Sequence, residues 1–337
     1  MSAMLIPVIF IVGLALLFDF LNGFHDAANA ISTVVVTGTL KPYQAVIVAG
    51  LAEFVGFFAF GVEIAKTVGK GVVQIDHVTL PVILAALIGA ITWNILTWIL
   101  GLPTSSSHAL IGGLIGAGVA SAGIGVVIPQ GFFKIVTFIA VAPILGLVGA
   151  TFFTTLILWI FRNSNFRKTQ PLFRYFQLAS AAVYCVGHGT NDAQKTMGVI
   201  ALTLFVGGVT KDFHLQNWIV LACYSAIALG TMSGGWRIVK TMGTKITKIR
   251  AREGFCAESA ASMILLGTAH FGIPVSTTHV IAGSIMGVGS AQSAAKVRWV
   301  TARKIVWAWI LTIPLTSVWS ASMFMLINFC SKHFFSH

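Results

Sequence analysis

Long apolar stretches, separated by short polar or basic loops, run through the whole chain. The first stretch, residues 3–40, is interrupted at Asp19 and by the polar run 22–29. A single helix over residues 3–40 would be about 57 Å long at about 1.5 Å per residue, whereas the hydrocarbon core of a membrane is roughly 30 Å thick. We therefore predict a membrane helix that is broken at the polar run, near the middle of the bilayer.

The rest of the first half predicts a second span, a hairpin and a closing span. The second span covers residues 43–65 and carries Glu53. Residues 79–125 form two apolar legs around the polar stretch Pro103–His108. Because this connection is glycine-rich instead of charged, we interpret the legs as a re-entrant hairpin that enters and leaves on one side of the membrane. A span over residues 131–161 completes the half.

The second half repeats this order of elements. An apolar stretch that we expect to be broken at the polar run 187–195 is followed by a span, a second hairpin and a final span. These elements cover residues 178–209, 217–234, 254–290 and 305–329. The two halves therefore predict an all-α polytopic membrane protein built from two repeats.

A short motif marks the tip of each predicted hairpin. Pro103–His108 reads Pro-Thr-Ser-Ser-Ser-His, Pro274–His279 reads Pro-Val-Ser-Thr-Thr-His, and a glycine-rich apolar segment follows each copy. Proline suits the first turn of a helix, and Ser or Thr caps the free N–H groups there, so each copy predicts a helix start. Such a terminus attracts anions, including phosphate, through its unpaired N–H groups and the positive end of the helix dipole.

Basic loops predict the orientation of these elements. Lysine and arginine concentrate in three loops, a pattern typical of the cytoplasmic side, at residues 162–174, 237–252 and 296–304. The three loops share one side only if each half makes three net crossings, which makes the repeats inverted and places both termini outside. The match of Gly23–Ala27 to Gly189–Ala193 supports the repeat independently. We expect a first repeat, a cytoplasmic linker and a second repeat at residues 1–161, 162–177 and 178–337.

Composition agrees with a multi-pass protein of the plasma (inner) membrane. Hydrophobic residues make up 57% of the chain, charged residues 9%, and the mean hydropathy is +0.91. The net charge of +12 lies in short loops between apolar spans, so it indicates topology and excludes a nucleic-acid partner. The four cysteines lack metal-ligand or disulfide spacing and are interpreted as packing residues. Residues 4–18 lack the features of a cleaved signal peptide, so we expect the first span to be retained.

The hairpin tips and the polar runs supply the candidate functional residues. Inversion brings the two tips together, so their hydroxyl groups and helix starts can form a cage for a small oxyanion such as phosphate. The candidate anion ligands are Thr104, Ser105, Ser106, Ser107, Ser276, Thr277 and Thr278. Asp26 and Asp192 recur at equivalent positions, and an acid near an anion site requires a cation between them.

The coupling cation is expected to be Na⁺ or a proton carried on a carboxylate, because the available ligands are oxygen atoms. The candidate ligands from the polar runs are Asp26, Asn29, Asn191, Asp192 and Gln194, with a Na⁺ site expected at Asp26, Asn29, Asn191 and Asp192. His25, His108, His279 and Lys195 are further candidates. For these histidines and for His188 the alternative is hydrogen-bonded packing, and for Lys195 it is a partner role toward Asp192 or Asp26.

These doubled motifs resemble those of the inorganic phosphate transporter (PiT) family over essentially the whole chain. The resemblance rests on Gly23–Asn29 and Gly187–Lys195, each followed by a Pro-x-Ser-Ser/Thr-Ser/Thr-His tip. It implies an inverted-repeat symporter for phosphate that acts as a homodimer and is not an enzyme. It also implies functional glutamates, whose contexts match Glu53 and Glu258, so both join the residues expected to couple the cation.

Two departures from the family pattern affect these expectations. Many family members carry Asn-Asp in the first signature, whereas this chain has His25-Asp26, which weakens the case for Na⁺ there. The large hydrophilic insert of some eukaryotic members is absent. The chain therefore resembles the compact bacterial form, for which the family implies proton coupling and phosphate carried as a complex with Mg²⁺ or Ca²⁺. No other cofactor is expected.

Two other functional classes compete with a symporter. A membrane-embedded lipid-phosphate phosphatase can also combine inverted repeats with re-entrant segments. Phosphoryl transfer, however, normally needs arginine, lysine or a metal at the reacting phosphate, and neither signature nor tip contains arginine. A passive anion channel would leave the paired acids unexplained.

Overall fold

The computed structural model describes residues 2–58, 64–65 and 71–334, and its elements there are helices with one isolated β-bridge. The helices are α1 (Ser2–Val36), α2 (Pro42–Val55), α4 (Leu80–Leu100), α5 (Ser106–Ala122), α6 (Pro129–Ile160), α7 (Phe166–Val206), α8 (Asn217–Ser233), α9 (Trp236–Lys240), α10 (Ala251–His270), α11 (Thr277–Gln292) and α12 (Trp299–Phe334). Within the described part, four helices are long and apolar enough to cross a membrane, namely α1, α4, α6 and α12. The predicted all-α membrane architecture is confirmed.

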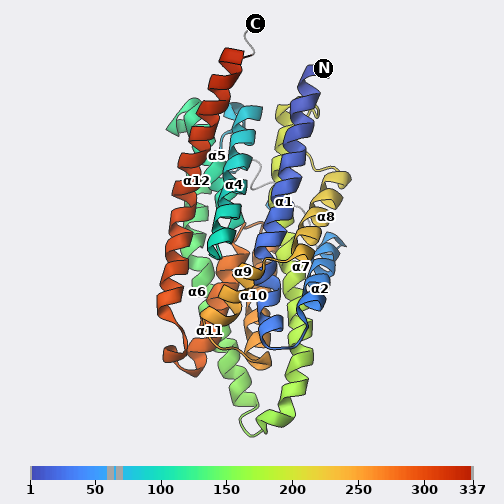
Figure 1. Cartoon of the computed structure of the whole chain (residues 1–337), viewed down its shortest axis with the longest axis vertical. Helices are drawn as coiled ribbons and strands as arrows, with labels where there is room; N and C mark the ends of the chain where they lie inside the picture. The colour runs from blue at the N-terminus through green and yellow to red at the C-terminus, as the bar shows by residue number, and fades with distance from the viewer. Residues whose placement is uncertain (1, 59–63, 66–70, 335–337) are drawn as a thin grey trace.

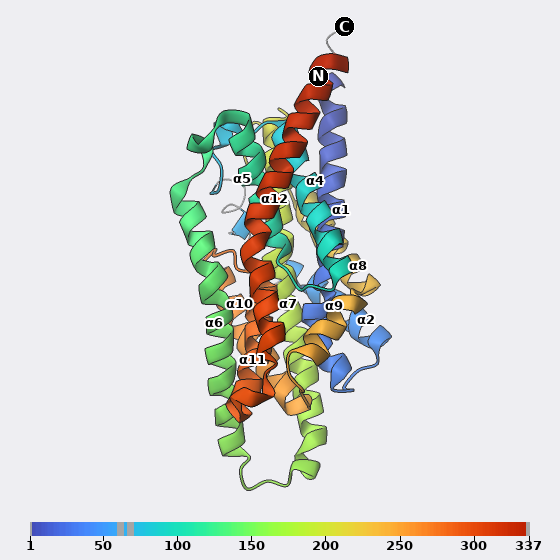
Figure 2. The same ribbon diagram turned by 60° about the vertical axis from the view of Figure 1, so that its left-hand side comes forward.

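The helices run along one long axis and form an elongated bundle. The start of α1 and the end of α12 lie at the same end of the molecule, which we call the terminal end (Figure 1). The turn between α6 and α7 lies at the opposite end, the α6–α7 end, in both views (Figures 1 and 2). The α4–α5 hairpin occupies the terminal half and the α10–α11 hairpin the other half, which agrees with inverted repeats.

Both hairpins enter and leave at one end because backbone hydrogen bonds close their feet. At the first hairpin, Gln74 N–H donates to Val126 O (2.9 Å) and Ile128 N–H donates to Val72 O (3.0 Å). At the second, Arg298 N–H donates to Ile246 O (2.9 Å). The predicted re-entrant connections are therefore present in both halves.

Each hairpin reverses through a glycine that adopts a left-handed conformation. Gly101 follows α4 with φ of 65°, and Gly272 follows α10 with φ of 60°. Side chains disfavour this region, whereas glycine enters it without a steric penalty. The tip motifs then start α5 and α11, as predicted, but Pro103 and Pro274 lie two residues before the capping residues Ser105 and Ser276 instead of inside the first turn.

The predicted breaks in the first and seventh helices are wrong in position. α1 runs through residues 22–29 and α7 runs through residues 187–195 as continuous helices of 35 and 41 residues. Polar side chains do not open a helix when their partners lie on neighbouring helices, because the backbone hydrogen bonds of the helix remain intact. Among the described residues, the pair that bends sharply at a short break is instead α8 and the segment Trp236–Lys245, which meet at 62°.

One expected segment is shorter in the structure, and another lies partly outside the described residues. The expected linker 162–177 contains only a short turn, because α7 already begins at Phe166. The expected second span, 43–65, is traced as α2 and a 3₁₀ turn at Gly56–Phe58, and residues 59–63 lie outside the described part. The length of this span therefore stays a prediction.

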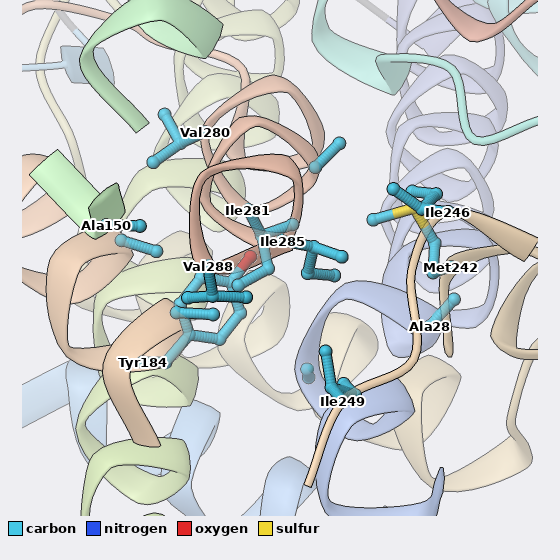
Figure 3. Close-up of a cluster of buried hydrophobic side chains, with 14 of the residues drawn as sticks. Ala28, Ala150, Tyr184, Met242, Ile246, Ile249, Val280, Ile281, Ile285 and Val288 are labelled. Carbon is cyan, nitrogen blue, oxygen red and sulfur yellow. The ribbon is translucent and has the colours of Figure 1, made fainter. Parts of the chain in front are cut away.

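Two hydrophobic clusters form the interior, one toward each end. The α6–α7 cluster includes residues of α1 from Ala28 onward and of α7 up to Cys185, and Figure 3 shows part of it, with Tyr184, Ile285 and Val288. The terminal cluster includes residues of α1 up to Phe18 and of α7 from Ala193 onward. The segments of α1 and α7 between the clusters carry the polar runs, so the fold holds a layer of buried polar residues between two apolar cores.

Candidate functional site

A polar belt lies between the two apolar clusters. We define it as Asp19, Asn22, His25 and Asp26 of α1, Glu53 of α2, and His188, Asn191, Asp192 and Lys195 of α7. Each of these residues is at most 2% exposed. Burying ionisable groups is costly unless they pair or bind ions, so this density of them indicates a functional site.

The two hairpin tips contact the belt through helix starts that are built alike. Ser105 accepts a hydrogen bond from His108 N–H (3.2 Å), and Ser276 accepts one from His279 N–H (3.2 Å). These two predicted phosphate ligands therefore act as N-caps of α5 and α11. The remaining N–H groups of both first turns have no carbonyl partner within their own helices, as at any helix start.

Lys195 and Asp192 join α7 to both tips. Lys195 Nζ donates to Asp192 Oδ1 (2.6 Å), to Ser107 Oγ (2.6 Å) and to the Val275 carbonyl (2.9 Å). Thr277 Oγ1 donates to the other carboxylate oxygen of Asp192 (3.0 Å). All three ammonium protons of Lys195 are thus used, and of its two expected partners it contacts Asp192.

Asp26 is held by a histidine and a threonine. Its Oδ1 lies 2.8 Å from His25 Nδ1, and its two carboxylate oxygens each lie 3.4 Å from Thr278 Oγ1. Asn29 donates to the same Thr278 hydroxyl (2.8 Å), and His25 Nε2 lies 3.2 Å from Thr97 Oγ1. The first signature therefore reaches the tip of the second hairpin, whereas Lys195 reaches both tips.

His188, which was weighed from the sequence but not selected for the site, connects three acids. Its Nδ1 lies 2.7 Å from Glu53 Oε1, and its Nε2 lies 3.3 Å from Asp192 Oδ2 and 4.0 Å from Asp26 Oδ2. A neutral imidazole carries one N–H, so it can donate to Glu53 or to the aspartates, but not to both at once. A second proton or a bound cation satisfies the other side. Its position four residues before Asp192, on the same helix face, was the available signal.

Asp26, His188 and Asp192 are the group that can hold a cation. One ligand atom from each residue lies within 4.8 Å of the others, and all three residues are buried. The amide nitrogen of Asn191 donates to the carbonyls of Gly187 (2.9 Å) and Leu265 (3.1 Å), and that of Asn29 donates to Thr278 (2.8 Å). The amide oxygens of both residues have no hydrogen-bond partner among the described residues, so the Na⁺ site expected at Asp26, Asn29, Asn191 and Asp192 stays a prediction. Gln194 accepts from the backbone of Ile64 (3.0 Å).

Glu258 belongs to a separate polar cluster. Its carboxylate accepts hydrogen bonds from Thr33 (2.5 Å), Ser180 (2.5 Å) and Gln177 (3.3 Å). Thr33 lies two helical turns beyond Asp26, about 10 Å along α1. The two glutamates selected together thus lie in different places, Glu53 at His188 and Glu258 toward the α6–α7 end.

The other selected tip residues lie around the junction of the two hairpins. The rings of His108 and His279 are 4.8 Å apart, and His279 stacks on Trp309 at 4.0 Å. The hydroxyls of Thr104 and Ser106 are buried and have no hydrogen-bond partner among the described residues. The hydroxyl of Ser106 is therefore free, among the described residues, to bind a ligand at the tip.

Asp19 is a further buried acid for which the sequence suggested no role. Thr196 Oγ1 donates to its Oδ1 (2.9 Å), while its Oδ2 has no partner among the described residues. Asp19 lies two turns before Asp26 on the same helix, on the terminal side of the belt. The polar belt thus extends along α1 beyond the signature itself.

Comparisons with known proteins agree with this geometry. The chain matches the model of the "Phosphate transporter family" over residues 22–169 and 161–320. It is 48% identical over 312 residues to the "Probable low-affinity inorganic phosphate transporter" of Rhizobium meliloti (strain 1021), which covers 92% of this chain and 93% of that protein. It is 43% identical over 333 residues to the protein of the same description in Bacillus subtilis (strain 168), covering 97% and 99%.

A solved structure titled "The sodium-dependent phosphate transporter" shares the fold. Its TM-score is 0.85 at 24% sequence identity, over 96% of this chain and 99% of that chain. Together with the two matched regions and the bacterial relatives, this likeness extends over nearly the full length described. The chain belongs to the phosphate transporter family.

Proposed function

We propose that this protein imports inorganic phosphate by symport with a cation. The observation that carries the proposal is that two N-capped helix starts, α5 and α11, meet at a buried belt of acids and are joined there by Lys195. Helix starts attract anions, and the acids provide the place for a coupling cation. The transporter family and the descriptions of the bacterial relatives support phosphate as the cargo.

Phosphate binds, on this proposal, where the two tips face the belt. Ser106, Ser107, Thr277 and Thr278 supply hydroxyls, the first turns of α5 and α11 supply N–H groups, and Lys195 supplies positive charge. To contact phosphate, Lys195 exchanges one of its three hydrogen bonds for a phosphate oxygen. When the hydrogen bond that Lys195 gives up is the one to Asp192, the carboxylate of Asp192 loses its positive partner. The belt then attracts a cation more strongly.

The cation binds between Asp26, His188 and Asp192. An imidazole nitrogen is a poor ligand for Na⁺, which prefers oxygen, whereas it accepts a proton readily near neutral pH. The ligand set therefore favours a proton over Na⁺, even though the solved structure of similar fold is titled as sodium-dependent. Glu53 takes part by orienting His188, and Glu258 acts through Thr33 on the same helix as Asp26.

Uptake into proteoliposomes with proton, Na⁺ and Mg²⁺ gradients imposed one at a time tests the proposal. A proton gradient should drive phosphate accumulation, and uptake without any gradient dependence would indicate a channel. Uptake that follows Mg²⁺ would assign the cargo to a metal-phosphate complex. Arsenate should compete well and sulfate poorly, because sulfate at neutral pH has no proton to donate to a belt carboxylate.

The orientation in the membrane is part of the proposal. With the α6–α7 turn in the cytoplasm of the plasma membrane, both termini lie outside. Cysteines placed at His77 and His214 in a cysteine-free background should label from outside, and one at Asn163 only from inside. Labelling of the cysteines at His77 and His214 only from inside, and of the one at Asn163 from outside, would mean that both termini lie in the cytoplasm. Cross-linking in the membrane tests the homodimer that the family resemblance implies.

The lipid-phosphate phosphatase alternative loses support, because the family is one of transporters. In the belt and at the tips, the described basic groups are Lys195 and histidines, without an arginine to stabilise a transferring phosphoryl group. Release of phosphate from a lipid phosphate by the purified protein would restore the enzyme alternative.

A further inference from the structure

A basic pocket lies at the foot of the second hairpin, far from the polar belt. The segment before α10 and the segment before α12 form its walls, and its volume is about 420 Å³. Its charged lining consists of Lys248, Arg250, Arg252, Lys296, Arg298 and Glu253. This volume is within the roughly 300–1,000 Å³ of small-molecule sites.

Hydrogen bonds between the two segments hold the pocket in shape. Arg298 N–H donates to Ile246 O (2.9 Å), and Thr247 Oγ1 donates to Lys296 O (3.1 Å). Gln292 donates to Glu253 (2.8 Å) and accepts from Lys296 Nζ (2.6 Å). The basic side chains therefore converge on one hollow whose walls are fixed by other contacts.

The positive charge of this pocket exceeds what its acid can neutralise. Glu253 already accepts hydrogen bonds from the Arg250 backbone (3.0 Å), from Arg252 (3.2 Å) and from Gln292. The sequence contains no other acid in residues 236–257 or 290–304. Five basic side chains around one carboxylate leave a formal excess of four positive charges.

Closing a hairpin foot does not require these charges. The foot of the first hairpin is closed by the same kind of backbone contact through Val72, Gln74, Val126 and Ile128, which carry no charge. An excess of basic residues on the cytoplasmic side accounts for lysine and arginine in these loops, but not for their convergence around a hollow. The convergence indicates a ligand.

We propose that this pocket binds an anion that carries two or more phosphate groups. Three of the five basic residues are arginines, whose planar groups bind phosphate oxygens in pairs. A single orthophosphate carries at most two charges near neutral pH and leaves half of the excess uncompensated, whereas a di- or triphosphate neutralises it. Soluble polyphosphates, nucleotides and polyphosphorylated lipid headgroups share this chemistry.

An anion in the pocket would tie the entrance of α10 to the start of α12. Because α11 carries Thr277 and Thr278 at its other end, immobilising the foot of this hairpin restrains the tip that contacts the belt. The bound anion would therefore slow phosphate import from the cytoplasmic side, and this consequence rests on the proposed function. Binding itself does not.

The binding test uses tripolyphosphate as the probe. It is titrated into purified protein in nanodiscs of neutral lipid, and isothermal titration calorimetry measures the affinity. The wild-type protein should bind it, and Lys248→Gln/Lys296→Gln should bind at least tenfold more weakly. Arg298→Gln, whose backbone and not its side chain closes the foot, should also weaken binding. The matched control is Lys240→Gln/Lys245→Gln, which removes the same charge from exposed lysines of the same loop outside the pocket. It should bind like the wild type.

Absence of binding to the wild-type protein, or equal loss in the control, would overturn the proposal. Repeating the titration with a polyphosphorylated lipid in the nanodisc distinguishes the two sources. If the lipid headgroup competes with tripolyphosphate for the wild-type protein but not for Lys248→Gln/Lys296→Gln, the pocket binds the headgroup. If tripolyphosphate binds without competition from the lipid, the pocket binds a soluble anion. Tripolyphosphate trapped inside proteoliposomes should then slow uptake by the wild type more than by Lys248→Gln/Lys296→Gln. If tripolyphosphate binds the pocket but slows uptake equally in the wild type and in Lys248→Gln/Lys296→Gln, only the proposed slowing of import is overturned.

Discussion

Asp26 of the first half and Asp192 of the second occupy equivalent positions but have different partners. Asp192 is bound by a lysine at 2.6 Å and by Thr277, whereas Asp26 is bound by a histidine at 2.8 Å and faces Thr278 at 3.4 Å. Asn29 stands where the second half has Lys195, and each contacts the third hydroxyl of the opposite tip.

On the proposed mechanism, this difference gives two otherwise equivalent carboxylates different tasks. The charge of Asp192 is compensated inside the protein, so this residue anchors both tips to α7. Among the described residues Asp26 has no lysine or arginine partner, so on the proposed mechanism its charge is available to the coupling cation. The repeat thus preserves the framework of contacts, while one substitution within it, Asn29 against Lys195, separates anchoring from coupling.

The largest effect expected from this comparison is on stability. Lys195→Met leaves Asp192 buried without its cation and should lower the free energy of unfolding by about 3–5 kcal/mol. Asn29→Leu removes a neutral hydrogen bond and should cost about 1–3 kcal/mol. SDS-induced unfolding in micelles measures both. Adding Asp192→Asn to Lys195→Met should recover part of the loss, and an equal cost of the two single variants would contradict the separation of roles.

The transport assay should separate the two acids in a different way. Asp26→Asn and Asp192→Asn should each reduce phosphate uptake at least about tenfold, because each removes a buried charge from the cation site. Only Asp192→Asn should also lower the melting temperature strongly, since it leaves Lys195 buried and unpaired. Near-normal uptake by Asp26→Asn would remove this residue from the coupling mechanism.

Two equivalent glycines offer a sharper test of helix packing next to the acids. A Cβ on Gly23 would lie 2.1 Å from the Ile227 carbonyl oxygen, whereas one on Gly189 would lie 2.8 Å from the Glu53 carbonyl oxygen. Gly23→Ala should therefore destabilise the protein by about 1–3 kcal/mol, and Gly189→Ala by less. Thermal unfolding of the two variants shows which loses more stability. A larger loss in Gly189→Ala would mean that the helices around Gly189 shift less easily than those around Gly23.

The smallest expected difference concerns two equivalent tip hydroxyls. Thr277→Val removes a hydrogen bond to the Asp192 carboxylate and should cost about 1 kcal/mol or more of stability. Ser106→Ala removes a hydroxyl that has no partner in the described part of the protein, so the unliganded protein should unfold almost as the wild type does. In phosphate binding, Ser106→Ala should weaken affinity by about 0.5–3 kcal/mol. Unchanged affinity in titrations of Ser106→Ala would remove Ser106 from the anion cage.

Hydrophobic pattern and repeated motifs were enough to predict the helical membrane fold, the hairpins and the phosphate transporter family. These features depend on apolar length, glycine and capping residues, which act locally. The continuity of α1 and α7 could not be predicted, because it depends on partners from other helices that satisfy the polar side chains. His188 was passed over for the same reason, since its importance comes from Glu53 and Asp26 on other helices.

The assignment of individual ligands was also limited because the sequence does not show which way each side chain points in the folded protein. The sequence places Asn191 next to Asp192 and Gln194 two residues beyond it, yet successive helical positions point in different directions. Gln194 consequently accepts from the Ile64 backbone, while Asn191 donates to the Leu265 carbonyl and keeps an amide oxygen that has no partner among the described residues. Asp192 and Lys195 lie three residues apart on α7 and therefore share one helix face, where Ser107 and Thr277 of the tips contact them, whereas Glu258 lies in a separate cluster.

The composition of the two apolar clusters also bears on how the chain is made. Each cluster draws residues from both halves, with α1 and α6 contributing to both, and with α7 and α12 completing each. During synthesis, the first 161 residues therefore emerge with neither core complete and with Asp26 lacking His188 and Thr278. The α4–α5 hairpin, which does not cross the bilayer, must wait in a partly assembled state until α12 arrives from the ribosome. A truncated first half should consequently be a substrate for membrane proteases, and co-expression of the second half as a separate chain should protect it.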